Sequence, residues 1–152
     1  FKTALDLMGR FDQDQGVRDI EATIRHARHA ERCEKVGVVG YCLGGRLAFM
    51  AAARTDADAS VGYYAVGVDN LLREKHAIAR PLLLHIPTGD HFVPAEAQKA
   101  MHDGLDDHPR VTLCDYRDLD HGFATETGKR RGEAGAALAD GRTSEFFAKH
   151  LA

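Results

Sequence analysis

Hydrophobic residues along the chain follow two spacings, one helical and one of short continuous runs. The helical spacing over residues 15–30 predicts a first helix, for which Asp12 and Asp14 are candidate N-terminal caps. Short apolar runs predict four strands, at residues 36–41, 60–65, 81–86 and 111–116. Helical stretches follow these strands, at about residues 43–54, 69–77, 94–106 and 135–150.

The regular succession of strands and helices predicts an α/β fold with a mainly parallel sheet, because parallel strands need helical crossovers. Neither a linker nor a repeat interrupts the pattern, so we expect residues 1–152 to form a single domain. The chain opens in helical sequence, which leaves the strand over residues 36–41 with a neighbour on one side only. Such an edge is an aggregation hazard. We therefore expect the C-terminal part of a larger fold whose N-terminal strands are missing.

Composition and charge narrow the class of protein. The chain of 152 residues is 44% hydrophobic and 28% charged, as expected of one globular domain with a sizeable core. Its net charge of −3, and a longest basic cluster that spans only residues 129–131, argue against a nucleic-acid or membrane partner. No apolar stretch approaches the roughly 20 residues that a membrane span needs, so we expect a cytoplasmic protein. Its oligomeric state is left open.

Three cysteines and nine histidines offer candidate chemistry. The cysteines form no Cys-x-x-Cys pair, which argues against a disulfide framework, a zinc site or a redox centre. We interpret Cys33 and Cys114 as ordinary thiols. His26 and His29 are three apart on the first helix and could share a metal, but arginines flank them and no third ligand is evident. We therefore expect no metal.

Cys42 lies in the sequence Gly-Tyr-Cys-Leu-Gly-Gly over residues 40–45, directly after a predicted strand and before a predicted helix. This is the nucleophile-elbow pattern Gly-x-Nu-x-Gly, in which small flanking residues let strand and helix approach each other. The helix start presents unpaired N–H groups that lower the pKa of a nearby thiol. The backbone N–H of Leu43 would form half of an oxyanion hole. A tight turn around a buried thiol is the alternative.

Two further residues complete a candidate triad. Asp90 follows the third predicted strand and His121 the fourth, so both are expected at the carboxyl edge of the sheet. The order nucleophile, acid, histidine is that of α/β-hydrolases. We assign Cys42 as nucleophile, His121 as general base and later acid, and Asp90 as the carboxylate that fixes the imidazole tautomer. The alternatives are a helix cap at Asp90, a surface role for His121, and His91 as a rival base.

With these residues the chain resembles the dienelactone hydrolase (carboxymethylenebutenolidase) family, a cysteine-dependent group within the α/β-hydrolase fold. The resemblance covers nearly the whole chain from Gly16 onward and includes the spacing of the three triad residues. It rests on four segments, at residues 40–45, 61–67, 90–94 and 121–124.

The resemblance implies hydrolysis of an enol-lactone, dienelactone to maleylacetate, in the bacterial breakdown of aromatic compounds. The thiolate would attack the lactone carbonyl, enolate departure would leave an acyl-enzyme, and water activated by His121 would release the diacid. No metal or organic cofactor is implied. Tyr63 would lie near the small-molecule substrate, with packing into the core as the alternative.

Two departures from the family pattern bear on function. The family's N-terminal strands are absent, and with them a glutamate that holds the resting cysteine and the second oxyanion donor. Thr125 stands where dienelactone-specific members carry an arginine for the substrate carboxylate. Lys129 or Arg130 would replace that arginine only if their loop folds inward. Two alternatives follow, a broader carboxylesterase on the same triad and a non-catalytic fragment of the fold.

Overall fold

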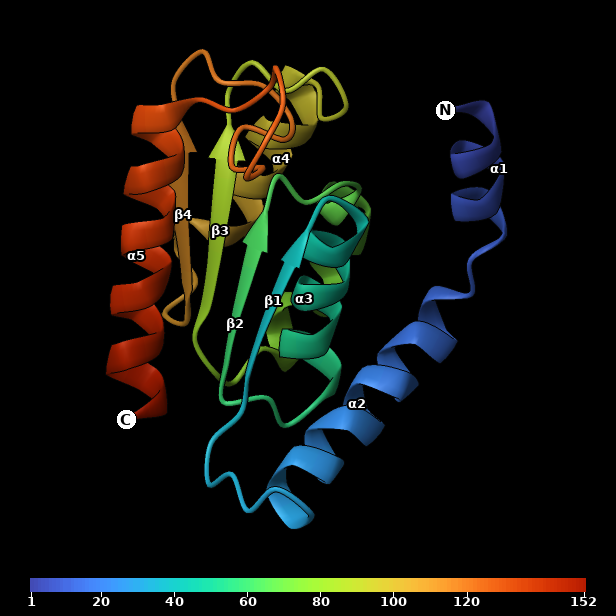
Figure 1. Ribbon diagram of the computed structural model, residues 1–152, viewed down its shortest axis with the longest axis vertical. Coiled ribbons are helices and arrows are strands. Elements are labelled where there is room, and N and C mark those ends of the chain that lie inside the picture. The colour runs from blue at the N-terminus through green and yellow to red at the C-terminus, as the bar shows by residue number, and fades with distance from the viewer.

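The computed structural model describes residues 1–152, and a sheet of four parallel strands forms its centre (Figure 1). The strands stand in chain order across the sheet, as β1 (Gly37–Tyr41), β2 (Ala59–Tyr63), β3 (Leu82–Pro87) and β4 (Val111–Tyr116). The helices are α1 (Lys2–Arg10), α2 (Gln13–His29), α3 (Leu43–Arg54), η1 (Val68–Ala77), α4 (Ala95–Leu105) and α5 (Glu133–Leu151).

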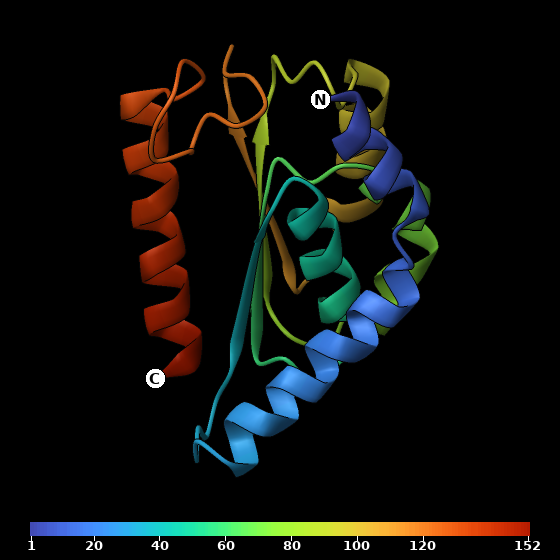
Figure 2. The ribbon, with the colours of Figure 1, turned by 45° about the vertical axis from the view of Figure 1, so that its right-hand side comes forward.

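Helices cover both faces of the sheet (Figure 2). The helices α3, η1 and α4 connect successive strands and lie on one face, with α2 packed against α3. The last helix, α5, lies on the opposite face against β2 and β3. Leu82 and Leu83 of β3 enter the two separate hydrophobic cores, because side chains alternate between the faces of a strand. None of the helices is both long and apolar enough to cross a lipid bilayer.

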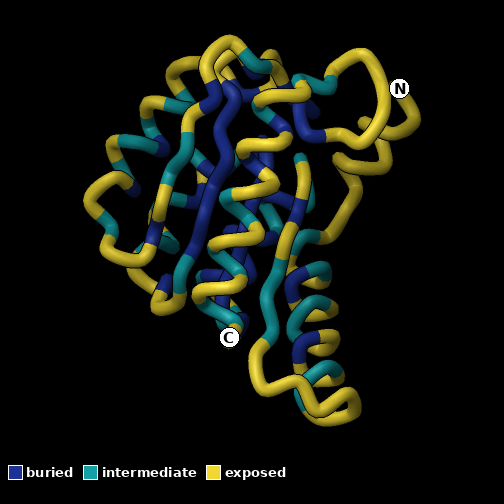
Figure 3. The backbone as a smooth tube through the Cα atoms, turned by 60° about the vertical axis from the view of Figure 1, so that its left-hand side comes forward, coloured by how far each residue is buried: buried dark blue, intermediate teal, exposed yellow.

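Burial is concentrated in the middle of the sheet (Figure 3). Every residue of β2 and β3 is buried, because these strands have neighbours on both edges and helices on both faces. In contrast, β1 is an edge strand, and Val39 and Tyr41 keep 45% and 48% of their surface exposed. The prediction that the elbow strand has a neighbour on one side only is confirmed for the sheet as it stands.

The predicted strands and helices are confirmed, with shifts of one or two residues at their ends. Asp12 is the residue that caps α2, since its carboxylate accepts a hydrogen bond from the N–H of Gln15 at 3.0 Å. The segment expected as a helix over residues 69–77 consists of tighter 3₁₀ turns in η1. Helix α1 adds a short element at the start of the chain, and it buries none of its residues.

Candidate active site

Cys42 joins the end of β1 to the first turn of α3. Its backbone has φ 58° and ψ −115°, a combination that side chains rarely adopt. Its N–H donates to the carbonyl of Tyr63 at 3.0 Å, which continues the ladder between β1 and β2 up to the turn. Cys42 therefore occupies the strained strand-to-helix turn that the elbow pattern predicts.

Two glycines allow the close approach at this turn. A Cβ on Gly40 would collide with the carbonyl of Gly44, and a Cβ on Gly45 would lie 2.9 Å from both the Cβ of Ala65 and the carbonyl of Tyr63. A Cβ on Gly44 would meet nothing within 4 Å. The expectation that the positions on both sides of Cys42 need small residues thus holds for Gly40. After Cys42, the crowded position is Gly45 rather than Gly44.

His121 and Asp90 come from loops after neighbouring strands and meet at the sheet edge. The imidazole Nδ1 of His121 lies 3.0 Å from Oδ2 of Asp90, and the two residues are only 5% and 6% exposed. The other oxygen of Asp90 accepts the N–H of Phe92 at 2.8 Å. The α4 helix begins without a side-chain cap, so Asp90 does not cap that helix. Because Nδ1 is engaged, Nε2 is the ring nitrogen left for Cys42.

Electrostatics around the thiol favour a thiolate paired with an imidazolium. Interaction with the His121 imidazole lowers the pKa of Cys42, and the backbone N–H of Leu43 acts in the same direction against the opposing effect of burial. Burial alone would lower the pKa of His121, but its hydrogen bond to Asp90 and its interaction with Cys42 raise it to about 9. A cysteine in this setting is activated for nucleophilic attack.

Two aromatic rings that sequence reasoning did not single out hold the imidazole of His121. The ring of Tyr64 lies 4.9 Å from it, and the ring of Phe92 lies 4.7 Å from it, centroid to centroid. Tyr64 is buried, has φ 37°, and its pKa is raised to about 12, mainly by burial. The available signal was its place directly after β2, which puts Tyr64 at the edge where Cys42 and His121 lie.

Tyr63 points away from this edge. It is 1% exposed, and its hydroxyl lies 2.8 Å from Oδ1 of Asp140 and 2.7 Å from Oγ1 of Thr143, both on α5. Its ring stacks on that of Tyr41 with 4.7 Å between centroids. Packing into the core therefore describes its position in this structure, and a substrate contact by Tyr63 stays a prediction.

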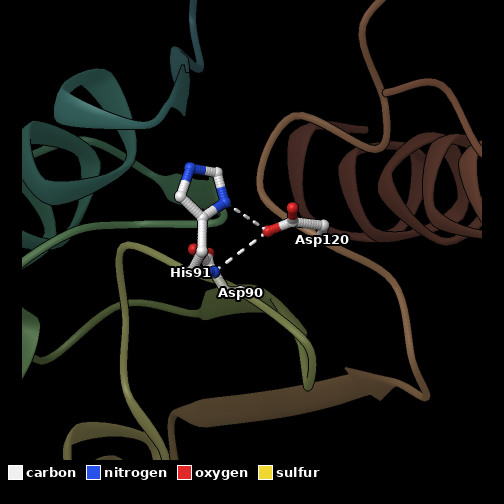
Figure 4. A group of neighbouring side chains, drawn as sticks. All are labelled: Asp90, His91 and Asp120. Carbon is white, nitrogen blue, oxygen red and sulfur yellow. Dashed lines mark hydrogen bonds and ion pairs between the residues drawn. The ribbon is translucent and has the colours of Figure 1, made fainter. Parts of the chain in front are cut away.

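His91, the rival base, is paired elsewhere. Its Nδ1 lies 2.7 Å from Oδ1 of Asp120 (Figure 4). Asp90 bonds His121 instead. The same Asp120 oxygen accepts the backbone N–H of His91 at 3.0 Å and that of His121 at 2.6 Å. Sequence reasoning missed Asp120, although its place next to His121 was the signal that could have drawn attention to it.

A surface hollow of about 500 Å³ opens beside Tyr41, which precedes Cys42, and Ala124, which lies three residues after His121. It is lined by Tyr41, Ala124, Glu126, Arg131, Glu133 and Asp140. The cation in this lining is neutralised, since Arg131 lies 2.7 Å from Glu133 and donates to the carbonyl of Thr125 at 2.9 Å. Neither of the two cations proposed to replace the family's arginine lines the hollow, and Arg130 lies against Gly122 instead.

The parallel sheet, the elbow and the ordered loops after β3 and β4 define an α/β-hydrolase-like protein. The family model described as "Dienelactone hydrolase family" matches residues 2–151, so the chain belongs to the dienelactone hydrolase family. A carboxymethylenebutenolidase of Pseudomonas putida is 40% identical over 146 residues, which are 95% of this chain and 62% of that protein. Carboxymethylenebutenolidase 1 of Cupriavidus pinatubonensis is 38% identical with the same coverage of 95% and 62%. The chain thus spans less than two thirds of the length of these relatives.

Solved structures share the fold at lower sequence identity. A candidate dienelactone hydrolase from Klebsiella pneumoniae has a TM-score of 0.82 at 22% identity, over 93% of this chain and 64% of that one. An esterase from Pyrococcus furiosus has a TM-score of 0.75 at 17% identity, over 91% of this chain and 63% of that one. These likenesses concern the arrangement of strands and helices.

Proposed function

We propose that this chain carries the nucleophile, base and acid of an enol-lactone hydrolase that converts dienelactone to maleylacetate. The observation that carries the proposal is the buried hydrogen bond between His121 and Asp90, placed beside Cys42 in its strained turn. Relatives named carboxymethylenebutenolidase support the choice of substrate. Because the chain spans less than two thirds of those relatives, the proposal concerns the residues that this chain supplies to the reaction.

In the first half of the reaction, the Cys42 thiolate attacks the lactone carbonyl carbon. The backbone N–H of Leu43 stabilises the negative charge that develops on the carbonyl oxygen. The ring C–O bond then breaks, and the ring oxygen leaves as an enolate, which needs little assistance because its charge is delocalised. The product of this step is a thioester between Cys42 and the opened substrate. The imidazolium of His121 then gives its proton to the enolate, which becomes the keto form of the opened substrate.

In the second half of the reaction, His121 is therefore neutral and acts as a base. Its Nε2 takes a proton from water while the water oxygen attacks the thioester carbonyl, and Asp90 stabilises the imidazolium that forms. The C–S bond breaks, the Cys42 thiolate is regenerated, and the diacid leaves. These steps use protein side chains and water, with no metal or organic cofactor.

The test is dienelactone turnover by the protein and its Cys42→Ala variant. Removing the nucleophile should lower kcat by at least about 10³-fold, because the histidine and acid cannot act without it. Cys114→Ala is the matched control, since Cys114 is a half-buried thiol in β4 whose pKa is raised by burial, and its loss should leave the rate unchanged. Unchanged turnover in the Cys42→Ala variant contradicts the proposal.

A broader carboxylesterase on the same triad is the second candidate, and the charge of the hollow favours it. Three carboxylates line the hollow against one paired arginine, and Thr125 offers no cation for a substrate carboxylate. An acidic hollow repels a carboxylated lactone more than an uncharged ester. Comparing kcat/KM for dienelactone and for p-nitrophenyl acetate decides between the two, because preference for the acetate ester points to the broader esterase.

A further inference from the structure

The paired residues His121 and Asp90 belong to two different loops. Asp90 lies in the loop after β3, and His121 lies in the loop after β4. Their 3.0 Å hydrogen bond forms only if the two loops keep their positions relative to each other. Loop backbones at a sheet edge are the most mobile parts of a domain, so a contact that ties them controls the geometry of the pair.

Two hydrogen bonds already join these loops, from the N–H of Gly89 to the carbonyl of Leu119 at 2.9 Å and from the N–H of Asp118 to Oγ1 of Thr88 at 2.9 Å. Asp120 adds a contact next to the pair itself, from a single oxygen atom. Its Oδ1 accepts the N–H of His91 at 3.0 Å and Nδ1 of the same residue at 2.7 Å. It also accepts the backbone N–H of His121 at 2.6 Å. Figure 4 shows the carboxylate of Asp120 reaching across to His91, which follows Asp90 directly in the chain. One carboxylate therefore joins the neighbour of Asp90 to the backbone of His121.

The bonds made by Asp120 are charge-assisted. The side-chain hydrogen bond from His91, followed by its backbone N–H, holds the pKa of Asp120 at about 2, so this carboxylate is ionised at any pH where the thiol reacts. Hydrogen bonds to a carboxylate are stronger than those to a neutral amide. Asp120 is about half exposed to solvent, and it bonds the backbone N–H of His121 rather than its imidazole ring.

We propose that Asp120 is a positioning residue that clamps the loop carrying Asp90 to the loop carrying His121, and so keeps the imidazole aimed at Cys42. The effect of this contact on catalysis rests on the proposed function, whereas the contact between the two loops does not. The ionisable groups that pack around the imidazole are Cys42, Asp90, Tyr64 and His91. Asp120 acts on this group through the backbone of its neighbour.

The test measures the reactivity of the Cys42 thiol directly. In a Cys33→Ser background, which removes the exposed cysteine, the rate of Cys42 alkylation by iodoacetamide is followed against pH by peptide mass spectrometry. Asp120→Ala should move the midpoint of the profile upward by about one pH unit, a roughly tenfold slower reaction below the midpoint, because an imidazolium that swings away no longer stabilises the thiolate. Asp106→Ala is the matched control, as it removes another Asp–His pair, 2.8 Å long, between Asp106 at the C-terminal end of α4 and His102 within it.

The second measurement is the turnover of dienelactone. Asp120→Ala should lower kcat on dienelactone with little change in KM, because substrate contacts remain while the base is misaimed. Asp120→Asn keeps an acceptor oxygen without the charge and should fall between the parent and Asp120→Ala. If Asp120→Ala does not fold, as checked by circular dichroism, Asp120→Asn decides. An alkylation profile that overlays the parent overturns the inference. If the alkylation profile of Asp120→Ala is shifted but the parent protein turns over no lactone, the proposed function is wrong and the positioning role of Asp120 is supported.

Discussion

Gly40 and Gly44 differ sharply at the residue scale, although the elbow pattern treats them alike. Gly40 faces the carbonyl of Gly44 so closely that no side chain fits, whereas Gly44 faces open space inside the first turn of α3. Glycine is needed where the backbone itself is the obstacle, because a main-chain atom cannot rotate away as a side chain can. The strained conformation of Cys42 therefore depends on Gly40, two residues before it, more than on Gly44, two residues after it.

The two alanine variants should change stability in opposite directions. Gly40→Ala should destabilise the protein by about 3 kcal/mol, at the upper end for overpacked sites. Gly44→Ala should stabilise it by about 0.5–1 kcal/mol, because alanine loses less backbone entropy than glycine in a helix. Urea unfolding midpoints measure both effects. Equal effects of the two variants would contradict the steric account.

The residues of the candidate site were predictable from the chain to different degrees. Cys42, Asp90 and His121 each follow a strand, and the edge at which parallel strands end is fixed by topology alone. Asp120 and Tyr64 carried a signal of place only, next to His121 and directly after β2, because their roles depend on which loop lies opposite and on how a ring packs. The sequence pattern places a residue at an edge of the sheet, but the packing of the folded chain determines which side chains it contacts.

At the scale of elements, α5 is held to the sheet by polar contacts as well as by apolar ones. The only residues that it buries are Ala136 and Ala139. The hydroxyl of Thr143 lies 2.7 Å from the hydroxyl of Tyr63 on β2 and 2.8 Å from Nε2 of His85 on β3. One side chain of α5 therefore contacts two strands. The half-buried rings of Phe146 and Phe147 also pack against this core, so the hydrogen bonds supply a share of what fixes the helix beside its apolar contacts.

Thr143→Val should reveal that share. It keeps the shape of the side chain but leaves Nε2 of the buried His85 without this partner, which should cost about 1–3 kcal/mol of unfolding free energy. Thr143→Ser keeps the hydroxyl and should cost only about 0.8 kcal/mol for the lost methyl group. Hydrogen exchange of the α5 amides should rise in the valine variant. Equal stability of the valine and serine variants would show that the network is dispensable.

Element positions were predictable because hydrophobic spacing reports burial, and the regular β1 to β4 succession allows few topologies. The 3₁₀ geometry of η1 was not, because its spacing over ten residues fits an α-helix equally well. The tether between α5 and the sheet was not predictable either. Thr143 reads as an ordinary surface helix residue until β2 and β3 are placed beneath it.

At the scale of the whole molecule, two buried histidines give stability opposite dependences on pH. The pKa of His121 is raised to about 9, so its contribution is complete below about pH 6.5 and is lost as the pH rises through 9. The pKa of His85 is lowered to about 3 by burial and then by the charge of Arg142. Between pH 6.5 and 3, His85 is protonated in the unfolded chain but neutral in the folded protein. The free energy of unfolding therefore falls as the pH falls. The protein should therefore be most stable near neutral pH.

His85→Gln isolates the acid side of this dependence. Glutamine carries no titrating group, so the variant should be less stable than the parent at pH 7 but should lose stability more slowly on acidification. The gap between the two proteins should narrow by about 1.4 kcal/mol for each pH unit below about 6.5, the value for one proton. Urea unfolding between pH 7 and 5 measures it, a range in which His121 stays protonated when folded. His76→Gln, at an exposed position on η1, is the control and should leave the slope unchanged. Parallel curves for the parent and His85→Gln would mean that His85 accepts a proton within the folded protein, and that the network linking β3 to α5 tolerates the charge.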